Sequence, residues 1–566
     1  MKCDYPWILT DRQRCDVELL LTGAFAPLEG FMTEKEYRSV LEDMILPSGA
    51  LWPIPITLDI SRELAGKLQA GDILHLLRED NSPVAQIKVT DVYPSDLPRE
   101  MQQIYGTDHQ DHAGVAILAE RHPFYVGGTV SETNPTVSEM ARHVDFLPPY
   151  RKPGELMERW KQIGKPVIAF QTRNPMHGAH QALTMAALRE VGDSHLLLHP
   201  VIGPTNPGDV RAAQRIRAIL ALAKTYPLDS GGLPVVTVAS LPLAMRMAGP
   251  REALWHAIIR QNFGAQYFIV GRAPADPGRN PARSDGYWWP PFEAQRLFRE
   301  VSRQLTIQPL FYPEYAWHQS HREFLPYHDG DQSGRFIRLS GSRVRQQLQR
   351  QEALPEWYAP QPVRDILQAG ALPQERRGLV ILFTGLSASG KSTLAKALSN
   401  VLSIQDARPV TLLDGDVVRR YLSKGLGFSP EDRHQHLERV AFVAQLISRH
   451  GGIALVSLIA PYEADRRLFR NMIKKDGTFV EVYMSAPLNV CEQRDPKGLY
   501  AQARAGQVRQ MTGLDVPYEA PKNPDVVIDT SAASVDMAMR HLVGYLEQHQ
   551  LVTVENLEPL FAPIIP

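Results

Sequence analysis

At 566 residues, the chain is too long for a single hydrophobic core, so we expect two to four domains. Its 61 basic and 62 acidic residues nearly cancel, which gives no reason to expect a nucleic acid or a membrane surface as partner. Three widely spaced cysteines, Cys3, Cys15 and Cys491, argue against a disulfide framework and favour a reducing compartment. The start lacks a signal-peptide pattern and no apolar run is long enough to cross a bilayer, so we expect a cytoplasmic protein.

Composition and periodicity divide the chain into four parts. Residues 1–153 mix short β-rich runs with turns, which predicts a small, mostly β module. Residues 154–345 alternate apolar runs with helical stretches, the pattern of a parallel α/β sheet. A Pro-, Gln- and Arg-rich passage at 346–377 is expected to form a small connecting subdomain or linker. A second α/β pattern fills 378–566, so the fold class is α/β and multidomain.

A histidine motif, QTRNPMHGAH at 171–180, follows the expected strand 166–170 and opens an expected helix. His177 and His180 are three residues apart, so both can face the same way across the first helical turn. Two imidazoles there can donate to a phosphate as charge develops during attack at the α-phosphorus. Surface or helix-capping histidines would give the same spacing, and the two residues alone leave both interpretations open.

Five segments of this half together resemble ATP sulfurylase (sulfate adenylyltransferase). They are GAFAPLEGFM (23–32), QTRNPMH (171–177), HPVIGPTNPGD (199–209), LPLAMRMAGPREALWHAIIRQNFGAQ (241–266) and LSGSRVR (339–345). That family joins sulfate to the α-phosphate of ATP, giving adenosine 5′-phosphosulfate (APS) and pyrophosphate. The resemblance implies a PUA-like N-terminal module and a Rossmann-like nucleotidyltransferase domain.

The same resemblance implies roles for particular residues. Gln171 and Arg173 would hold sulfate, while His177, His180 and Arg272 would steady the transition state. The implied site also includes Thr172, Asn174, Gly271 and Ala275.

The loop GRAPADPG at 271–278 departs from the family pattern GRDHAGPG. Pro274 has no N–H to offer to a phosphate, and it biases Ala273 towards an extended backbone. Asp276 adds a negative charge close to where anionic phosphates and sulfate would meet.

Two further departures remove positive charge. Asn206 replaces the lysine of the family's TKPGD, and Gly178 replaces an arginine within the histidine motif. Losing one oriented donor at such a site can cost roughly 10²–10³ in rate. We therefore expect a vestigial sulfurylase-like site, inactive or nearly so, with a divergent but active loop as the alternative.

A phosphate-binding motif opens the C-terminal part. GLSASGKST at 385–393 fits G-x-x-x-x-G-K-[ST], follows an expected strand and precedes an expected helix. Lys391 should reach the β- and γ-phosphates of ATP, and Ser392 should ligate Mg²⁺, the expected cofactor. The expected nucleotide contacts are Gly385, Ser387, Ala388, Ser389, Gly390, Lys391, Ser392 and Thr393.

A second strand, in TLLDGDVVRRYL at 411–422, ends in two carboxylates, Asp414 and Asp416. A carboxylate at the C-terminal end of a parallel strand lies in the ligand crevice, where it can orient or deprotonate an attacking hydroxyl. A metal-binding or helix-capping role for Asp414 stays open from the residues alone. A guanine-reading N-K-x-D motif is absent from the sequence.

Here the chain resembles APS kinase over most of 378–530. The segments are LLDGD (412–416), GLGFSPEDR (425–433), IAPYEADR (459–466), CEQRDPKGLYAQAR (491–504) and TGLDVPYEAPKNPDVVIDT (512–530). That family moves the γ-phosphate of ATP to the 3′-hydroxyl of APS, giving 3′-phosphoadenosine 5′-phosphosulfate (PAPS).

This resemblance implies that Asp414 orients the 3′-hydroxyl and acts in catalysis with Lys391. Arg419 and Arg433 would hold the phosphosulfate, Phe428 would stack on adenine, and Lys497 would lie in a segment that closes over the nucleotides. The remaining implied APS contacts are Asp416, Ile459, Ala460, Gly498 and Leu499.

Four positions depart from the kinase pattern. Val417 and His436 stand where Asn is usual, and Met511 stands where a second adenine-stacking Phe is common. Ala460 replaces a serine sometimes assigned as a phosphoenzyme intermediate, so only direct transfer is open.

The sequence therefore predicts an ATP- and Mg²⁺-dependent APS kinase fused behind a sulfurylase-like domain. The order of the two parts resembles fungal sulfurylases, which implies a homo-oligomer, a hexamer by analogy. The alternatives are a bifunctional PAPS synthase, a front half that serves as an assembly or regulatory module, and, less well supported by the motifs, a different small-molecule kinase.

Overall fold

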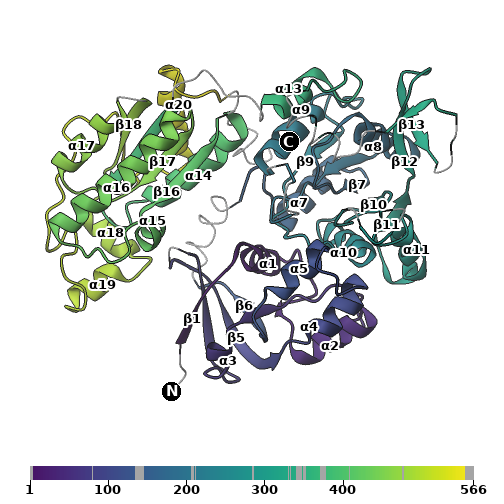
Figure 1. Ribbon diagram of the computed structural model, residues 1–566, viewed down its shortest axis with the longest axis horizontal. Helices are drawn as coiled ribbons and strands as arrows, with labels where there is room; N and C mark the ends of the chain where they lie inside the picture. Colours follow the sequence, from purple (N-terminus) through teal and green to yellow (C-terminus); the bar gives the residue numbers. More distant parts are fainter. Residues whose placement is uncertain are drawn as a thin grey trace.

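The chain forms three α/β regions, each with its own main sheet, and a small fourth sheet (Figure 1). The computed structural model describes residues 4–79, 81–133, 146–205, 209–210, 212–278, 280–283, 286–328, 331, 333–338, 344, 347, 352–369, 378–406, 408–474 and 477–554. Asn206 and most of the segment 339–345 lie outside the described residues.

The N-terminal region is a six-stranded mixed sheet with the order β1-β4-β5-β6-β2, and β3 pairs with β6. Its strands are β1 (Asp4–Ile8), β2 (Gly30–Phe31), β3 (Leu58–Ile60), β4 (Ile73–Leu77), β5 (Pro83–Pro94) and β6 (Phe124–Ser131). Its helices are α1 (Asp11–Leu21), α2 (Glu34–Asp43), α3 (Arg62–Ala65), α4 (Leu97–Glu100), the π-helical turn η1 (Met101–Tyr105) and α5 (Ala113–Ala119).

The middle region is a five-stranded, all-parallel sheet with the order β11-β10-β7-β8-β9. Its strands are β7 (Val167–Phe170), β8 (His195–Leu198), β9 (Val236–Val238), β10 (Tyr267–Val270) and β11 (Gln308–Phe311). The order reverses between β7 and β10, which is the switch point where doubly wound sheets bind ligands. This arrangement confirms the Rossmann-like fold.

Helices and a small antiparallel sheet surround this middle sheet. The helices are α7 (Pro153–Ile163), α8 (Gly178–Val191), α9 (Ala212–Ala223), α10 (Gly249–Asn262), α11 (Glu293–Glu300), the 3₁₀ turn η2 (Ser302–Gln304) and α13 (Gln361–Ala369). The small sheet contains β12 (Glu314–His318), β13 (Glu323–Tyr327) and β14 (Phe336–Ile337). Residues of the expected connecting passage, including Leu354, Tyr358 and Val363, are buried in the same core as β7 and β8. The described part of 346–377 therefore packs as part of the middle region.

The C-terminal region is a second all-parallel sheet with the order β16-β17-β15-β18-β19. Its strands are β15 (Gly378–Gly385), β16 (Val410–Asp414), β17 (Ile453–Ser457), β18 (Gly477–Met484) and β19 (Val526–Ile528). Its helices are α14 (Lys391–Gln405), α15 (Gly415–Tyr421), α16 (Pro430–Arg449), α17 (Glu463–Ile473), α18 (Leu488–Arg494), α19 (Leu499–Arg504) and α20 (Val535–Gln548).

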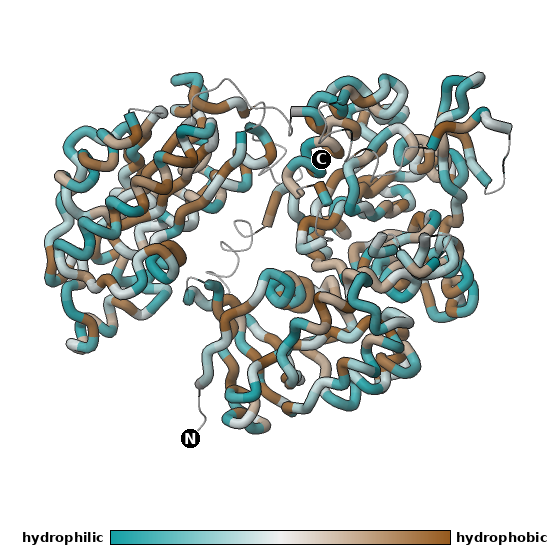
Figure 2. Tube along the Cα trace, in the orientation of Figure 1, coloured by the Kyte–Doolittle hydropathy of each residue, from teal (hydrophilic) through white to brown (hydrophobic). Residues whose placement is uncertain are grey.

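The central strand β15 is buried along its whole length because helices cover both faces of the sheet. Leu379, Ile381 and Phe383 share one core with α14 and α20, whereas Val380 and Leu382 share the other with α16 and α17. This two-residue alternation follows from strand geometry. The sheet shows as a hydrophobic centre between helices with hydrophilic outer surfaces (Figure 2). Over the described residues, no helix combines the length and apolarity needed to span a membrane.

A buried ion pair joins the first two regions. Arg246 donates from Nη2 to both carboxylate oxygens of Asp16, at 2.8 and 2.6 Å, and both side chains are at most 2% exposed. Asp16 lies on α1 and Arg246 lies just before α10, so the contact bridges residues far apart in the chain. An unpaired charge at this depth would be strongly unfavourable.

We predict that Asp16→Asn lowers the stability of the N-terminal and middle regions by about 3–5 kcal/mol, because Arg246 loses its buried partner. The matched control is Asp11→Asn on the same helix. Asp11 pairs with Arg14, but its side chain is 76% exposed. That control should cost about 0–1 kcal/mol. Urea unfolding followed by tryptophan fluorescence measures both; equal shifts for the two variants would contradict the prediction.

Candidate active sites

The phosphate motif forms the tight turn between β15 and α14. Three of its residues have positive φ: Gly385 (+149°), Ala388 (+60°) and Gly390 (+91°), the last at the N-cap of α14. A β-carbon at Gly385 would lie 2.6 Å from the Met484 carbonyl oxygen, so only glycine fits there. The loop therefore ends at the N-terminus of α14, where backbone N–H groups can face an anion.

The cation of this loop is present and buried. Lys391 Nζ donates to the Leu386 carbonyl at 2.6 Å, so the side chain folds over the loop. Burial lowers the pKa of Lys391 to about 8, so the ammonium is mostly charged at neutral pH. Tyr500 and Thr530 donate to the carbonyls of Ser387 and Ser389, which fixes the loop from outside.

Asp414 ends β16 as expected and touches the phosphate loop. Its Oδ2 accepts from Ser392 Oγ at 2.6 Å, and its Oδ1 accepts from the Asp416 amide at 3.1 Å, which caps α15. Asp414 therefore caps α15, one of the roles left open by the sequence, and it also contacts Ser392, the expected metal ligand. Ser457 Oγ, at the end of β17, lies 3.1 Å from Ser392 Oγ and was not singled out from the sequence.

The donors around Ser392 are hard oxygen atoms, which suits Mg²⁺. Among the described residues, no group of three or more His, Cys, Asp or Glu side chains gathers into a metal site. A Mg²⁺ ion held by the Ser392 hydroxyl, by water and by the phosphates of ATP fits these oxygen donors.

Two arginines and an aromatic ring form a cluster beside α15. The guanidinium carbons of Arg419 and Arg433 lie 4.6 and 5.7 Å from the centroid of the Phe428 ring, which is 55% exposed. Burial lowers the pKa of both arginines, and for Arg419 the charge of Arg433 adds to the effect. Arg433 also donates to Thr512 Oγ1 at 3.0 Å, which ties the cluster to the segment after residue 510. The concentration of positive charge suits an anionic ligand.

The other expected APS contacts lie along the same edge of the sheet. Lys497 forms an ion pair with Asp416 on α15, and Gly498 caps α19, which begins at Leu499. Ile459 and Ala460 follow β17, and the Ile459 carbonyl accepts from Thr384 Oγ1 at 2.6 Å. Of the departures, His436 is buried against Ser423 with its pKa lowered to about 4, and Met511 is buried in a cluster with Cys491 and Tyr500.

The histidine motif and the loop 271–278 meet at the switch point of the middle sheet, after β7 and β10. The rings of His177 and His180 lie 4.2 Å apart, so the expected facing arrangement is present. His177 caps α8 and stacks on Tyr358 at 4.6 Å. Burial lowers the pKa of both histidines, that of His180 to about 4, so both are neutral at pH 7.

The two arginines expected to bind anions face acids of the same region. Arg173 Nη1 lies 3.5 Å from Asp209, and its Nη2 donates to the Asp276 carbonyl at 2.8 Å. Arg272 contacts Tyr287 and lies 3.5 Å from Glu314. The remaining expected residues are close by: Thr172 Oγ1 donates to the Asn174 carbonyl at 3.1 Å, and Gln171 directly follows β7.

The loop 271–278 corrects one expectation. Ala273 is not extended: its φ is +45°, and Ala275 has +55°. The preference imposed by Pro274 is overridden because the Ala273 amide donates to the Pro291 carbonyl at 2.7 Å, which ties the loop to the segment before α11. Asp276 accepts from the Gly278 and Trp288 amides and so folds the loop onto itself.

Gly178 leaves no room for the arginine of related proteins. A β-carbon at Gly178 would lie 2.2 Å from Cε2 of Phe324, a side chain of β13. The glycine amide also donates to the Tyr358 carbonyl at 2.9 Å. Phe324 and Tyr358 therefore cover the start of α8.

Fold and site together define a P-loop kinase fold joined to a Rossmann-like nucleotidyltransferase fold. Family models match in the same order: a PUA-like domain at 5–135, ATP-sulfurylase at 149–369 and adenylylsulphate kinase at 377–529. The chain belongs to the family of proteins that join an ATP sulfurylase domain to a C-terminal APS kinase domain.

The relatives match along nearly the whole chain. The sulfate adenylyltransferases of Phaeosphaeria nodorum and Mycosarcoma maydis are each 40% identical, over 96% of this chain and 94% of theirs. A solved structure, the hexameric APS kinase from Thiobacillus denitrificans, is 28% identical with a TM-score of 0.51, covering 97% of this chain and 94% of that one.

The buried side chain of His112 joins the N-terminal region to the segment after the loop 271–278. His112 contacts Trp288 at 4.7 Å, and its Nδ1 accepts from the Gly114 and Val115 amides at 3.1 and 3.3 Å. Burial lowers the pKa of His112 to about 4. Because the folded-state pKa lies below the ordinary value, the unfolded chain takes up the proton first, and stability is lost as the pH falls from about 6.5 towards 4.

We predict that His112 alone costs about 1–2 kcal/mol of stability between pH 7 and pH 5. His112→Asn keeps a capping oxygen but does not titrate, so urea unfolding of this variant should depend less on pH. The control is the neighbouring His109→Asn, whose side chain is 54% exposed. The prediction fails if both variants retain the pH dependence of the unmodified protein.

Proposed function

We propose that the chain is an APS kinase that transfers the γ-phosphoryl group of ATP to the 3′-hydroxyl of APS, giving PAPS and ADP. We further propose that its sulfurylase-like part does not make APS at a significant rate. The observation that carries the first proposal is the complete phosphate loop with Lys391 folded over it and Asp414 within 2.6 Å of Ser392.

Each proposed role follows from the chemistry of the side chain. Lys391 neutralises charge on the β- and γ-phosphates, and Ser392 would hold Mg²⁺, which supplies further positive charge to those phosphates. Asp414 orients the 3′-hydroxyl and accepts its proton as the new P–O bond forms and the bond to the ADP oxygen breaks. Transfer is direct because Ala460 offers no hydroxyl.

The cluster around Phe428 is the proposed APS pocket. Arg419 and Arg433 bring two guanidinium groups to one exposed ring, which suits a nucleotide that carries a phosphosulfate. Lys497 and Asp416 join the segment before α19 to α15, so this ion pair is the proposed closing contact over APS.

The proposal for the front half rests on charge. Arg173 faces Asp209, and the lysine that would offset Asp209 in related proteins is Asn206 here. A sulfate ion at Arg173 would therefore meet a cation already balanced by a carboxylate. Arg272 lies 3.5 Å from Glu314, a carboxylate that Arg338 also holds at 2.7 Å, and burial lowers the pKa of both histidines. Adenylyl transfer brings sulfate and the phosphates of ATP together, and such a site needs uncompensated donors.

The names of the relatives favour a second candidate, a bifunctional PAPS synthase, because full-length proteins at 40% identity are called sulfate adenylyltransferases. The Thiobacillus denitrificans protein, which aligns over 97% of this chain, is instead described as a hexameric APS kinase. We propose the same assembly here, with the front half as an assembly or nucleotide-binding regulatory module. Buried free thiols at Cys15 and Cys491 accord with the proposed cytoplasmic location.

A paired assay separates the two candidates. One reaction contains ATP, Mg²⁺, sulfate and pyrophosphatase, and the other contains ATP, Mg²⁺ and APS. We expect PAPS in the second reaction only, and phosphate release at background level in the first. Sulfate-dependent phosphate release above background would overturn the proposal for the front half. Lys391→Ala should abolish PAPS formation without changing the thermal unfolding profile, and retained activity would refute the role of the phosphate loop.

The role of Asp414 has its own test. We expect Asp414→Asn to lower kcat by about 10²-fold or more while changing the ATP dissociation constant by less than about 3-fold, because its partner is the acceptor hydroxyl. Steady-state kinetics and equilibrium titration with ATP measure the two quantities. A comparable loss of ATP affinity would show that Asp414 serves the metal instead.

A further inference from the structure

The turn after β17 has a backbone conformation that its sequence disfavours. Ala460 has a φ of +43°, in the left-handed region that residues with a β-carbon rarely adopt, and it is only 5% exposed. Such a conformation persists only where the surroundings hold it, and it is most often held at functional sites.

This turn abuts the first residues of the phosphate loop. Thr384 Oγ1 donates to the Ile459 carbonyl at 2.6 Å and lies 3.4 Å from the Ala460 carbonyl oxygen. The Gly385 amide donates to the Ile459 carbonyl at 3.4 Å. A displacement of the turn would therefore shift the strand end from which the phosphate loop begins.

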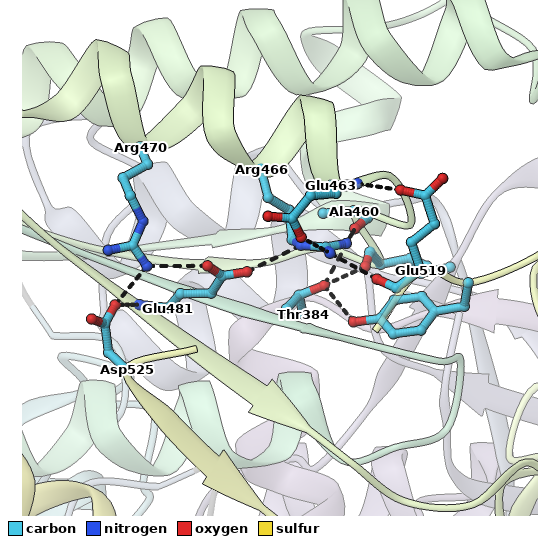
Figure 3. Close-up of polar contacts among 10 residues, drawn as sticks. Thr384, Ala460, Glu463, Arg466, Arg470, Glu481, Glu519 and Asp525 are labelled. Carbon is cyan, nitrogen blue, oxygen red and sulfur yellow. Dashed lines mark hydrogen bonds and ion pairs between the residues drawn. The ribbon is translucent and has the colours of Figure 1, made fainter. Parts of the chain in front are cut away.

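A buried arginine holds the turn from the opposite side. Arg466, on α17, has a side chain that is 1% exposed. Its Nη1 donates to the Ala460 carbonyl at 2.7 Å (Figure 3). Its Nη2 donates to Glu463 Oε2 and to the Glu519 carbonyl, each at 2.7 Å, and its Nε lies 3.0 Å from Glu481 Oε1. One planar guanidinium thus joins the turn, the segment around Glu519 and strand β18.

The acceptors of Arg466 are themselves fixed. Arg470, one turn further along α17, pairs with Glu481 at 3.1 Å and with Asp525 at 2.8 Å (Figure 3). The Glu463 amide donates to Glu519 Oε2 at 2.7 Å. Arg470 shares the carboxylate of Glu481 with Arg466, but its partners in the described structure, Glu481 and Asp525, lie outside the turn at Ala460. The two arginines therefore form a matched pair within one network.

We propose that Arg466 is a positioning residue for phosphoryl transfer, which holds Ala460 in its left-handed conformation and thereby aligns the turn 459–462 with the phosphate loop. The proposal rests on the proposed kinase function. Arginine suits this role because its fork can reach three acceptors at fixed angles, whereas a lysine ammonium cannot span the Ala460 and Glu519 carbonyls in the same way. Small displacements of groups near the reacting atoms can cost about 10²-fold in rate.

The first test compares Arg466→Lys with Arg470→Lys at saturating ATP and APS. We expect Arg466→Lys to lower kcat by about 10-fold or more, with the KM for ATP changed by less than about 3-fold. Arg470→Lys removes a fork from the same ion-pair network, at a side chain that is 23% exposed, and should keep kcat within about 2-fold of the unmodified protein. Equal effects of the two variants on kcat would overturn the proposal.

The second test asks whether Arg466 acts through Ala460. Glycine adopts the left-handed conformation without the β-carbon penalty, so the turn of an Ala460→Gly protein depends less on being held. In a double-mutant cycle, Arg466→Lys should reduce kcat by a smaller factor in the Ala460→Gly background than in the native background. The same factor in both backgrounds would mean that Arg466 acts only through general stability, which contradicts the proposal.

A third variant decides the matter if Arg466→Lys does not fold. Thr384→Val is nearly isosteric and removes the hydroxyl that donates to the Ile459 carbonyl and lies 2.9 Å from the Tyr518 hydroxyl, so it should lower kcat with little change in the KM for ATP. Unchanged kcat in Thr384→Val would overturn the proposal. Failure of the unmodified protein to form PAPS would be a different result, because it would refute the kinase assignment before any variant is compared.

Discussion

The ion pair between Arg173 and Asp209 shows how a carboxylate of the protein can compete with an anionic substrate for an arginine. An arginine binds an anion strongly only when its charge is not already balanced within the protein. At the switch point of the middle sheet, Arg173 and Arg272 each face a carboxylate, and the two histidines carry no charge at neutral pH. The nucleotidyltransferase fold is present, and our proposal that the front half makes little APS rests on this pairing of its arginines with carboxylates.

At the C-terminal sheet, the positive charges of Arg419, Arg433 and Lys391 are less compensated by carboxylates. Arg419 and Arg433 both lie over the Phe428 ring, where their positive charges repel each other. The buried Lys391 donates to a backbone carbonyl rather than to a carboxylate. Repulsion among such cations is unfavourable in the free protein and is relieved when an anion binds. The carboxylates that pair with Arg466 and Arg470 lie behind the site, where they hold loops in place.

The sequence was most informative where the structure is local. The phosphate loop is a contiguous strand, glycine turn and helix, so its position and its buried lysine could be predicted from residues 379–402 alone. Contacts made by tertiary packing could not. Ser457 meets Ser392, and Arg466 meets Glu519, only because separate strands and loops end at the same edge of the sheet. At Ala273 the local preference for an extended backbone is overridden by a tertiary hydrogen bond from its amide to the Pro291 carbonyl. The expected boundaries at 153, 345 and 377 stay predictions.

Charge compensation at the front site is tested most directly by the reverse of adenylyl transfer. The purified protein is supplied with APS, pyrophosphate and Mg²⁺, and the ATP formed is followed by luciferase luminescence. We predict ATP formation no faster than with heat-inactivated protein, from a preparation that converts ATP and APS to PAPS. Steady, pyrophosphate-dependent ATP formation would show that the middle region still binds its anions in reactive alignment, and would contradict charge compensation at this site.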